Sequence, residues 1–141
     1  MKQIIIGIDP DIDKSGVAAL DHGDEYFDMW EMTFFEIFNM LQKHKERIKM
    51  VYIEAGHLNK KSNWHKYGKG EGVAARIGKN VGSNHQVGRL LEQMCQYLSV
   101  PYTMVKPMGK KDVDEFYDIT GIKTLKKDQD KRDAAMLIWG R

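Results

Sequence analysis

The segment Gln3 to Asp9, QIIIGID, restricts the fold of this 141-residue chain more than any other. Its β-branched residues follow one another without polar alternation, a pattern typical of a strand that is covered on both faces. Covering both faces of a sheet requires helices on both sides, so we expect an α/β protein. A single domain is expected over residues 1–141, because this length supports one ordinary core and not two.

Four further segments have strand patterns. A turn at Lys14 to Gly16 separates the first strand from the second, and DHGD at Asp21 to Asp24 predicts a hairpin between the second and third. The first three strands are therefore expected to be antiparallel neighbours. The expected strands after the first are Val17 to Leu20, Glu25 to Trp30, Lys49 to Glu54 within KMVYIEAG, and the segment VPYTMVKP, which ends at Pro107.

Helical spacing of apolar residues predicts helices between the later strands. A glycine-rich, basic segment over residues 57–80 is expected to be an unusually long connection, followed by a helix that Ser83 caps. The expected helices are Thr33 to Lys45, Ser83 to Leu98, Lys111 to Tyr117 and Asp128 to Trp139.

This order gives three meandering strands and then two strands that are reached through helical crossovers. Right-handed crossovers place the fourth strand beside the first, which predicts a five-stranded mixed sheet of order 3-2-1-4-5 with helices on both faces. The arrangement resembles the ribonuclease H type of architecture.

Four carboxylates are expected to meet in such a fold. Asp9 ends the first strand and Glu54 ends the fourth, and these two strands are neighbours at the centre of the sheet. Asp130 and Asp133 stand at positions i and i+3 and so share one face of the last helix. The two alanines that follow Asp133 are small, which would allow this helix to lie close to the sheet.

Converging carboxylates repel one another unless a cation balances their charge. An all-oxygen cluster suits Mg²⁺ or Mn²⁺, and two such ions about 4 Å apart stabilise the attacking water and the leaving oxygen in phosphodiester hydrolysis. Each acid also has a simpler interpretation. Asp9 could cap a turn, Glu54 could end an exposed strand, and Asp130 and Asp133 could stabilise the first turn of a helix through its dipole.

Asp11 and Asp13 follow Asp9 at alternate positions, so strand periodicity alone would direct all three to one side. Pro10 donates no ladder hydrogen bond, and the Ser15-Gly16 turn follows, so regular pairing should weaken beyond Asp9. We therefore expect Asp9 to be the metal ligand and the other two to belong to the turn. Asp11 could still hold a water next to the metal.

The segment from Asn59 to Asn80 carries six basic residues against one acid, Glu71, although the formal charge of the whole chain is only +2. Basic and aromatic side chains interleaved in this way can neutralise phosphates and stack on exposed bases, although a merely solvated loop is the alternative. Lys106, Lys110 and Lys111 flank the expected acidic site. The expected nucleic-acid-binding residues are Lys60, Lys61, Trp64, Lys66, Tyr67, Lys69, Arg76, Lys79 and Lys111.

Other features exclude several classes of protein. Cys95 is the only cysteine, so an internal disulfide is impossible, and its position among apolar residues of a helix predicts a buried structural thiol. No stretch approaches the roughly 18 apolar residues of a membrane span. A chain with 42% hydrophobic and 30% charged residues is expected to be globular and cytoplasmic.

Three segments, in this order and with these separations, resemble the RuvC family of Holliday junction resolvases, particularly its compact phage members: GIDPDIDKSGVAAL, VYIEAG and DKRDAAMLI. The resemblance spans nearly the whole chain. It implies that Asp9, Glu54, Asp130 and Asp133 are the metal ligands. Asp11 stands where cellular relatives more often have glycine. NVGSNHQVGRLLEQM resembles the family's next helix, in which Gly88 would permit close helix packing or a dimer contact.

The resemblance further implies a homodimer that binds a four-way DNA junction and nicks two strands symmetrically with Mg²⁺ or Mn²⁺. A ribonuclease H-like or pre-rRNA processing nuclease would share the fold and the acids. A catalytically inactive DNA-binding scaffold belongs to a different class, and the presence of all four acids disfavours it. An ATP-binding domain of the actin and hexokinase type is disfavoured because it needs a second nucleotide-binding half.

Overall fold

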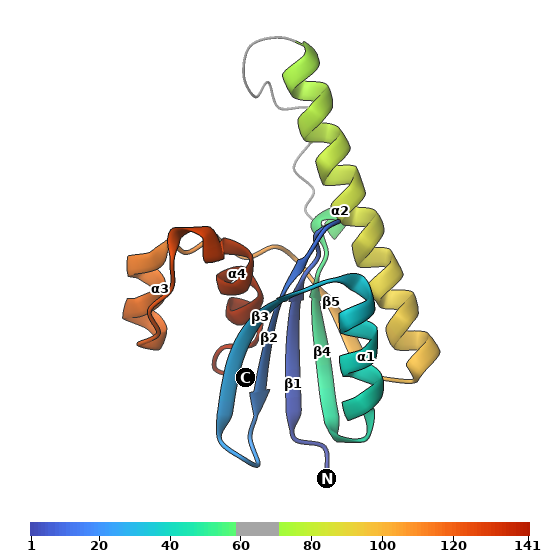
Figure 1. Cartoon of the computed structure of the whole chain (residues 1–141), viewed down its shortest axis with the longest axis vertical. Coiled ribbons are helices and arrows are strands. Elements are labelled where there is room, and N and C mark those ends of the chain that lie inside the picture. The colour runs from blue at the N-terminus through green and yellow to red at the C-terminus, as the bar shows by residue number, and fades with distance from the viewer. Residues whose placement is uncertain (59–70) are drawn as a thin grey trace.

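The computed structural model describes residues 1–58 and 71–141, with the side chains of residues 1–56, 58 and 82–141. Figure 1 shows a central sheet with helices on both of its faces. The strands are β1 Ile4–Asp9, β2 Ser15–Asp21, β3 Tyr26–Met32, β4 Ile48–Glu54 and β5 Tyr102–Val105. The helices are α1 Phe34–His44, α2 Glu71–Leu98, α3 Val113–Thr120 and α4 Gln129–Ile138, and three short 3-10 turns are η1 Lys45–Arg47, η2 Gly56–Leu58 and η3 Lys126–Asp128.

The sheet has the order β3-β2-β1-β4-β5, which confirms the fold predicted from the sequence. Strand β1 pairs antiparallel with β2 and parallel with β4, so β1 and β4 lie side by side at its centre. Asp9 is the last residue of β1 and pairs with Gly16 of β2. Regular pairing therefore ends at Asp9, immediately before Pro10, because proline has no amide hydrogen to donate.

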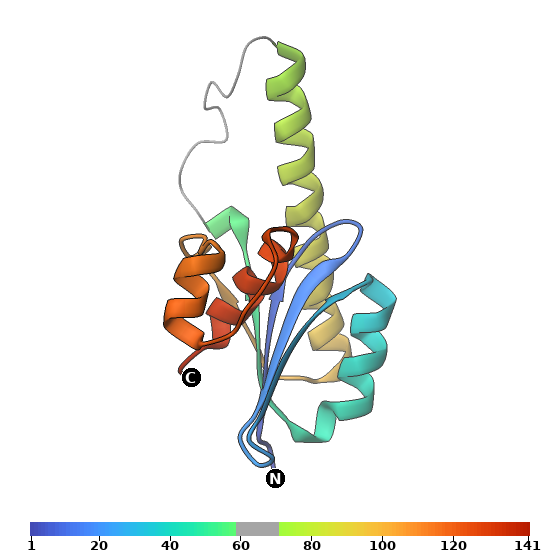
Figure 2. The same ribbon diagram turned by 60° about the vertical axis from the view of Figure 1, so that its left-hand side comes forward.

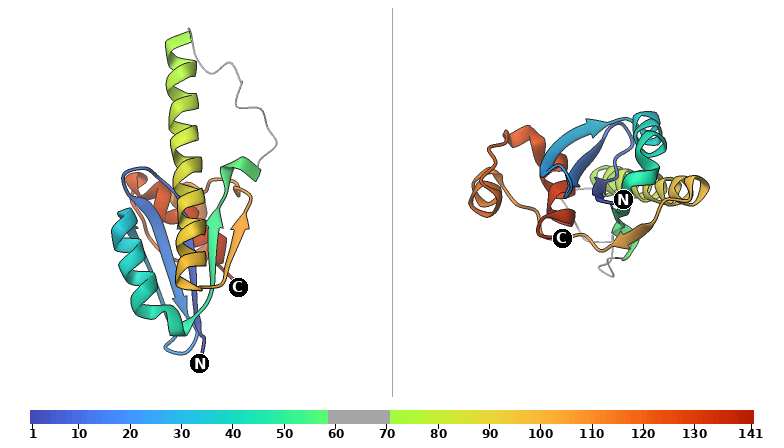
Figure 3. Two further views of the ribbon diagram at one scale, coloured as in Figure 1. Left: turned by 90° about the vertical axis from the view of Figure 1, so that its right-hand side faces the viewer. Right: turned by 90° about the horizontal axis from the view of Figure 1, so that it is seen from below.

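Alternation along the central strands separates two cores on opposite faces of the sheet. Ile4, Ile6 and Ile8 face α1 and α2, together with Val51 and Ile53 of β4. The intervening residues face α4, and this second core includes Ile5, Ala18, Tyr52, Ala134 and Leu137. Asp9 continues the series of Ile5 and Gly7, and Glu54 continues the series of Tyr52, so both acids belong to the α4 face. The end-on view of Figure 3 shows α4 and the α1–α2 pair on either side of the sheet.

Helix α4 lies unusually close to the sheet because glycines face it. A Cβ atom built on Gly7 would overlap the carbonyl oxygen of Ala134, and one built on Gly16 would overlap the carbonyl oxygen of Asp130. The small alanines of α4 were expected to permit this approach, and Ala134 and Ala135 are indeed fully buried. The glycines on the two strands are equally necessary, because the contact is between strand backbone and helix backbone.

Helix α2 begins earlier than the sequence suggested. The expected long connection over residues 57–80 is wrong for its last ten residues, because α2 begins at Glu71, and Ser83 lies inside the helix instead of capping it. Three glycines in EGVAARIGKNVG lower the helix propensity of this stretch and conceal the signal. Val73, Ile77 and Val81 recur at four-residue spacing, a helical pattern that could have revealed it.

With 28 residues, α2 is about 42 Å long, and its N-terminal half extends beyond the carboxyl ends of the strands, as Figures 1 and 2 show. Its C-terminal half packs on the sheet through Leu91, Met94 and Cys95. Cys95 has no exposed surface, which confirms the prediction of a buried thiol. Gly88 is buried against Pro10, so it serves the close packing of α2 inside the chain.

The remaining boundaries differ little from those expected. Strand β5 is shorter than its segment, α3 begins at Val113 behind a capping box formed by Asp112 and Glu115, and α4 begins at Gln129 after η3. Thr33 caps α1 in the same way with Glu36. Within the residues that the structure describes, no helix is long and apolar enough to cross a membrane.

Candidate active site

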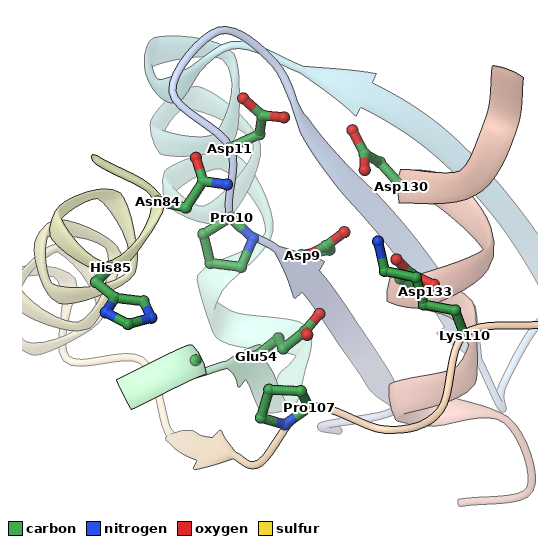
Figure 4. A pocket seen from close by; sticks show the side chains of 11 residues that line it. Asp9, Pro10, Asp11, Glu54, Asn84, His85, Pro107, Lys110, Asp130 and Asp133 are labelled. Carbon is green, nitrogen blue, oxygen red and sulfur yellow. The ribbon is translucent and has the colours of Figure 1, made fainter. Parts of the chain in front are cut away.

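The four acids that the sequence singled out line one pocket at the carboxyl ends of β1 and β4 (Figure 4). The pocket has a volume of about 290 Å³. Asp9 and Glu54 enter it from neighbouring strand ends, and Asp130 and Asp133 enter it from the first turn and a half of α4. The strands bring their acids together by pairing, and α4 adds its two because it crosses this face of the sheet so closely.

Three of these carboxylates form a compact group. One oxygen each from Asp9, Asp130 and Asp133 lies within 4.8 Å of the other two, and all three residues are half-buried. The Glu54 side chain is hydrogen-bonded to that of Asp9. An all-carboxylate donor set of this kind fits a hard divalent cation such as Mg²⁺ or Mn²⁺, which prefers oxygen ligands.

The raised pKa values of the pocket acids show the electrostatic repulsion that a bound cation would relieve. Burial, the hydrogen bond with Glu54 and the charges of the other acids raise the pKa of Asp9 to about 10. Burial is also the main reason why the pKa values of Glu54 and Asp130 are raised. Asp9 therefore keeps its proton at neutral pH in the metal-free protein and donates it to Glu54, and a bound cation would displace this proton.

In metal-free protein, the raised pKa of Asp9 should make the free energy of unfolding fall as the pH rises between about 4 and about 10. The folded protein keeps a proton on Asp9 that the unfolded chain releases above its ordinary pKa of 3.8, so raising the pH favours unfolding. Mg²⁺ would bind only the ionised cluster of the folded state, so added Mg²⁺ should raise the melting temperature more at about pH 8 than at about pH 5.

Thermal melting in chelator and in Mg²⁺ at the two pH values measures this effect. The Asp9→Asn variant removes the titrating group and should lose most of the pH-dependent difference, whereas Asp13→Asn, in the exposed turn, should keep it. Equal Mg²⁺ shifts at both pH values in the wild-type protein would contradict the prediction.

Among the described residues that line the pocket, Lys110 is the basic one. Its side chain lines the pocket, and its positive charge lowers the pKa values of Glu54 and Asp130 against the dominant effect of burial. Figure 4 shows its amine directed toward Asp9 and Asp133. An exposed lysine in this position can contact a phosphate oxygen of a substrate that enters the pocket.

Asp11 both forms the turn and lines the pocket. Its Oδ1 accepts a hydrogen bond from the Asp13 amide at 3.3 Å, and its own amide donates to Ser15 Oγ at 3.0 Å. Its charge also raises the pKa of Asp130, so its carboxylate lies near the cluster and is not simply carried toward solvent. Asp13 lies in the exposed turn and does not line this pocket.

Asp128, the residue before α4, is engaged elsewhere. Its Oδ2 accepts a hydrogen bond from the Leu125 amide at 2.8 Å, and its Oδ1 lies 3.5 Å from Lys131 Nζ. These contacts fix the η3 turn that leads into α4. Asp128 is therefore a turn residue, separate from the acids of the pocket.

Sequence reasoning did not single out three residues that belong to the site. Asn84 and His85 of α2 line the pocket opposite α4, and a Cβ atom on Gly56 would lie 2.5 Å from His85 Nε2. The third is Gln129, whose Nε2 donates to Asp133 Oδ1 at 2.7 Å. The segment that contains Asn84 and His85 resembles a family helix, but no residue pattern predicted that these two side chains lie over the pocket, because their position follows only from the packing of α2.

The predicted nucleic-acid-binding residues lie mostly beyond the described residues. Arg76 and Lys79 lie in helix α2 and not in the expected loop, and the structure describes only their backbone. Lys111 is half-buried, and its carbonyl oxygen accepts hydrogen bonds from α4. Lys60, Lys61, Trp64, Lys66, Tyr67 and Lys69 fall within residues 59–70, outside the part of the chain that the structure describes.

The chain has a ribonuclease H-like fold with an acidic pocket where its two central parallel strands end. Two solved structures are similar over almost the whole chain. T. thermophilus RuvC in complex with a Holliday junction substrate has a TM-score of 0.52 and 15% identity, covering 96% of this chain and 90% of RuvC. The fowlpox virus Holliday junction resolvase has a TM-score of 0.50 and 12% identity, covering 95% and 94%.

No protein-family model and no curated protein matches the sequence. The likeness to RuvC is therefore one of fold, which confirms the architecture that the sequence resemblance implied.

Proposed function

We propose that this chain is a metal-dependent endonuclease that resolves four-way DNA junctions by phosphodiester hydrolysis. The observation that carries the proposal is the meeting of Asp9, Asp130 and Asp133 within 4.8 Å, with Glu54 hydrogen-bonded to Asp9. Half-buried carboxylates this close together repel one another and destabilise the folded protein. A bound cation would balance their charge and could activate water for hydrolysis. The shared fold with two Holliday junction resolvases supports four-way junctions as the substrate.

Asp9, Glu54, Asp130 and Asp133 would hold Mg²⁺, or Mn²⁺ in its place, and we propose two ions as the full complement of the four carboxylates. When bound, such ions supply charge neutralisation at the phosphodiester and activation of the attacking water. Lys110 adds a positive charge at the mouth of the pocket, where it orients the scissile phosphate. Asn84 and His85 form the opposite wall and limit how the DNA strand enters.

Symmetric resolution requires two nicks, one in each of two opposed strands. The structure describes one compact carboxylate group in the chain, so a pair of nicks calls for two copies of the protein on one junction. A homodimer with two pockets related by a two-fold axis would match the symmetry of a four-way junction.

The test is a cleavage assay with metal-free protein, added Mg²⁺ or Mn²⁺, and four labelled substrates of equal length: a synthetic four-way junction, a fork, a linear duplex and an RNA-DNA hybrid. Paired nicks at symmetric positions of the junction, absent in chelator, are the expected result. Preferred cleavage of the hybrid would favour a ribonuclease H-like activity instead. Tight junction binding with no metal-dependent cleavage of any substrate would favour an inactive scaffold.

The basic segment should contribute to DNA binding and not to chemistry. Replacing Lys60, Lys61, Lys66 and Lys69 together by Gln should reduce the slope of log affinity against log salt by up to roughly four counterions' worth, because each phosphate contact releases condensed cations. The melting temperature should hardly change. Junction affinity measured at several salt concentrations gives the slope.

The matched control replaces four exposed lysines at the opposite end of the sheet: Lys2, Lys43, Lys45 and Lys49. This control removes the same charge and should leave the salt slope nearly unchanged. Similar slopes for the two quadruple variants would show that the basic segment is only a solvated surface.

A further inference from the structure

Gln129, the first residue of α4, connects a metal-site acid to a rigid network. Its Nε2 donates to Asp133 Oδ1 at 2.7 Å and lies 3.2 Å from the carbonyl oxygen of Lys111. Its Oε1 accepts from Arg132 at 3.0 Å. Both ends of one amide are therefore engaged, one toward the acidic pocket and one toward the interior.

Arg132 is the anchor of this network. It is 2% exposed, and it donates hydrogen bonds to neutral oxygens of residue 111, of residues 124–126 and of Gln129. Its Nε donates to the Lys111 carbonyl at 2.9 Å, and one terminal nitrogen donates to Thr124 Oγ1 at 3.0 Å and to the Leu125 carbonyl at 2.7 Å. Among the described residues it forms no ion pair with a carboxylate. Such a multiply bonded guanidinium has little freedom to rotate.

The chemistry of the two partners fixes the orientation of the Gln129 amide. A guanidinium can only donate, so the oxygen of Gln129 must face Arg132. The amide nitrogen must then face Asp133, which accepts through a carboxylate oxygen. Rotating the amide by half a turn would set donor against donor at Arg132 and acceptor against acceptor at Asp133.

We propose that Gln129 is a positioning residue that orients the Asp133 carboxylate for metal binding, with Arg132 holding the Gln129 amide in the donating orientation. The inference deepens the proposed function and rests on its metal site. One oxygen of Asp133 is held by the amide, so the carboxylate cannot rotate freely and its remaining lone pairs stay directed into the pocket. Partners that orient a ligand in this way typically account for 10- to 100-fold in metal affinity.

The test is calorimetric titration of the metal-free protein with Mn²⁺ or Mg²⁺ in the absence of DNA. Gln129→Met keeps the side-chain length and removes the amide, and it should weaken metal binding about 10-fold or more. Gln96→Met is the matched control. Gln96 lies on the exposed surface, and its Nε2 also donates to a side-chain oxygen, Tyr102 Oη, at 2.8 Å. The control should bind metal like the wild-type protein.

Gln129→Ala is the second variant, in case methionine packs poorly against Arg132. The space that alanine leaves can admit a water molecule, which would accept the hydrogen bond from Arg132. It should show the same loss of affinity in protein that circular dichroism shows to be folded. In the junction cleavage assay, higher metal concentration should restore the rate of both Gln129 variants, a rescue that a purely structural defect would not give.

Three results are decisive. Weakened metal binding in folded Gln129 variants, with a normal Gln96→Met control, supports the positioning role. Wild-type affinity in either folded Gln129 variant overturns it and leaves the proposed metal site intact. Absence of metal binding in the wild-type protein overturns both the positioning role and the metal site.

Discussion

Asp9→Asn is expected to slow metal-dependent junction cleavage by about three orders of magnitude, equivalent to about 4 kcal/mol of transition-state stabilisation. Asp9 links the acid at the end of β4 to the two acids of α4. It is hydrogen-bonded to Glu54, and it belongs to the compact group with Asp130 and Asp133. Asparagine keeps the shape but contributes no charge, and its amide nitrogen cannot bind a cation.

The matched variants are Asp11→Asn and Asp13→Asn in the same turn. Asp11 lines the pocket without belonging to the compact group, so its variant should be mildly impaired and should recover at higher Mg²⁺. Asp13→Asn should cleave like the wild-type protein. Cleavage rates across a Mg²⁺ titration separate the three, and an Asp9→Asn protein with substantial activity would remove the proposed metal centre.

Junction binding should survive the Asp9 change, because the basic residues that neutralise phosphate are untouched. In chelator the affinity should therefore hardly change, because Asp9 already carries a proton in the metal-free protein at neutral pH. The same variant should be more stable than the wild-type protein without metal, because the raised pKa of Asp9 reflects an unfavourable interaction in the folded state.

Gly16→Ala is expected to destabilise the protein by about 3 kcal/mol and to lower its melting temperature by roughly 10 °C. A Cβ atom at this position would overlap the backbone carbonyl of Asp130, and backbone cannot move aside as a flexible side chain can. Relief requires α4 to shift away from the sheet. That shift also carries Asp130 away from Asp9, so metal binding and cleavage should fall together with stability.

Gly82→Ala is the matched control for this prediction. Gly82 lies within α2, and among the described atoms outside the adjacent backbone of this helix none lies within 4 Å of a Cβ atom built there. Alanine should raise stability by up to about 1 kcal/mol, because glycine is a poor helix former. Chemical denaturation of the two variants gives both values, and a neutral Gly16→Ala would show that α4 does not depend on this close approach.

Much of the fold was predictable because its signals are local. The uninterrupted apolar run of β1, the DHGD hairpin and the helical spacing after Thr33 each depend on neighbouring residues, and the handedness of crossovers then orders the strands. The sheet order 3-2-1-4-5 followed from these signals and is confirmed. The start of α2 was missed because its glycines weaken the local signal, while the length of the helix is supported along its C-terminal half by packing on the sheet.

The site was predictable where it depends on strand alternation and helical spacing. Asp9 and Glu54 share a face because β1 and β4 are parallel neighbours, and Asp130 and Asp133 share one because of the helical repeat. The structure places all four around one pocket, and their role as ligands remains a proposal. Asp11 was harder to place, because a turn residue has no periodicity to fix its direction.

The sequence alone determined which residues are acidic, which face of each element they occupy and which strands are neighbours, since these depend on local periodicity and chain connectivity. Only the tertiary structure decided how closely α4 approaches the sheet, that Asn84 and His85 close the pocket, and that Arg132 fixes Gln129 against Asp133. These contacts join residues far apart in the chain or depend on side-chain orientation. No local pattern encodes them, because packing settles them only once all the elements are in place.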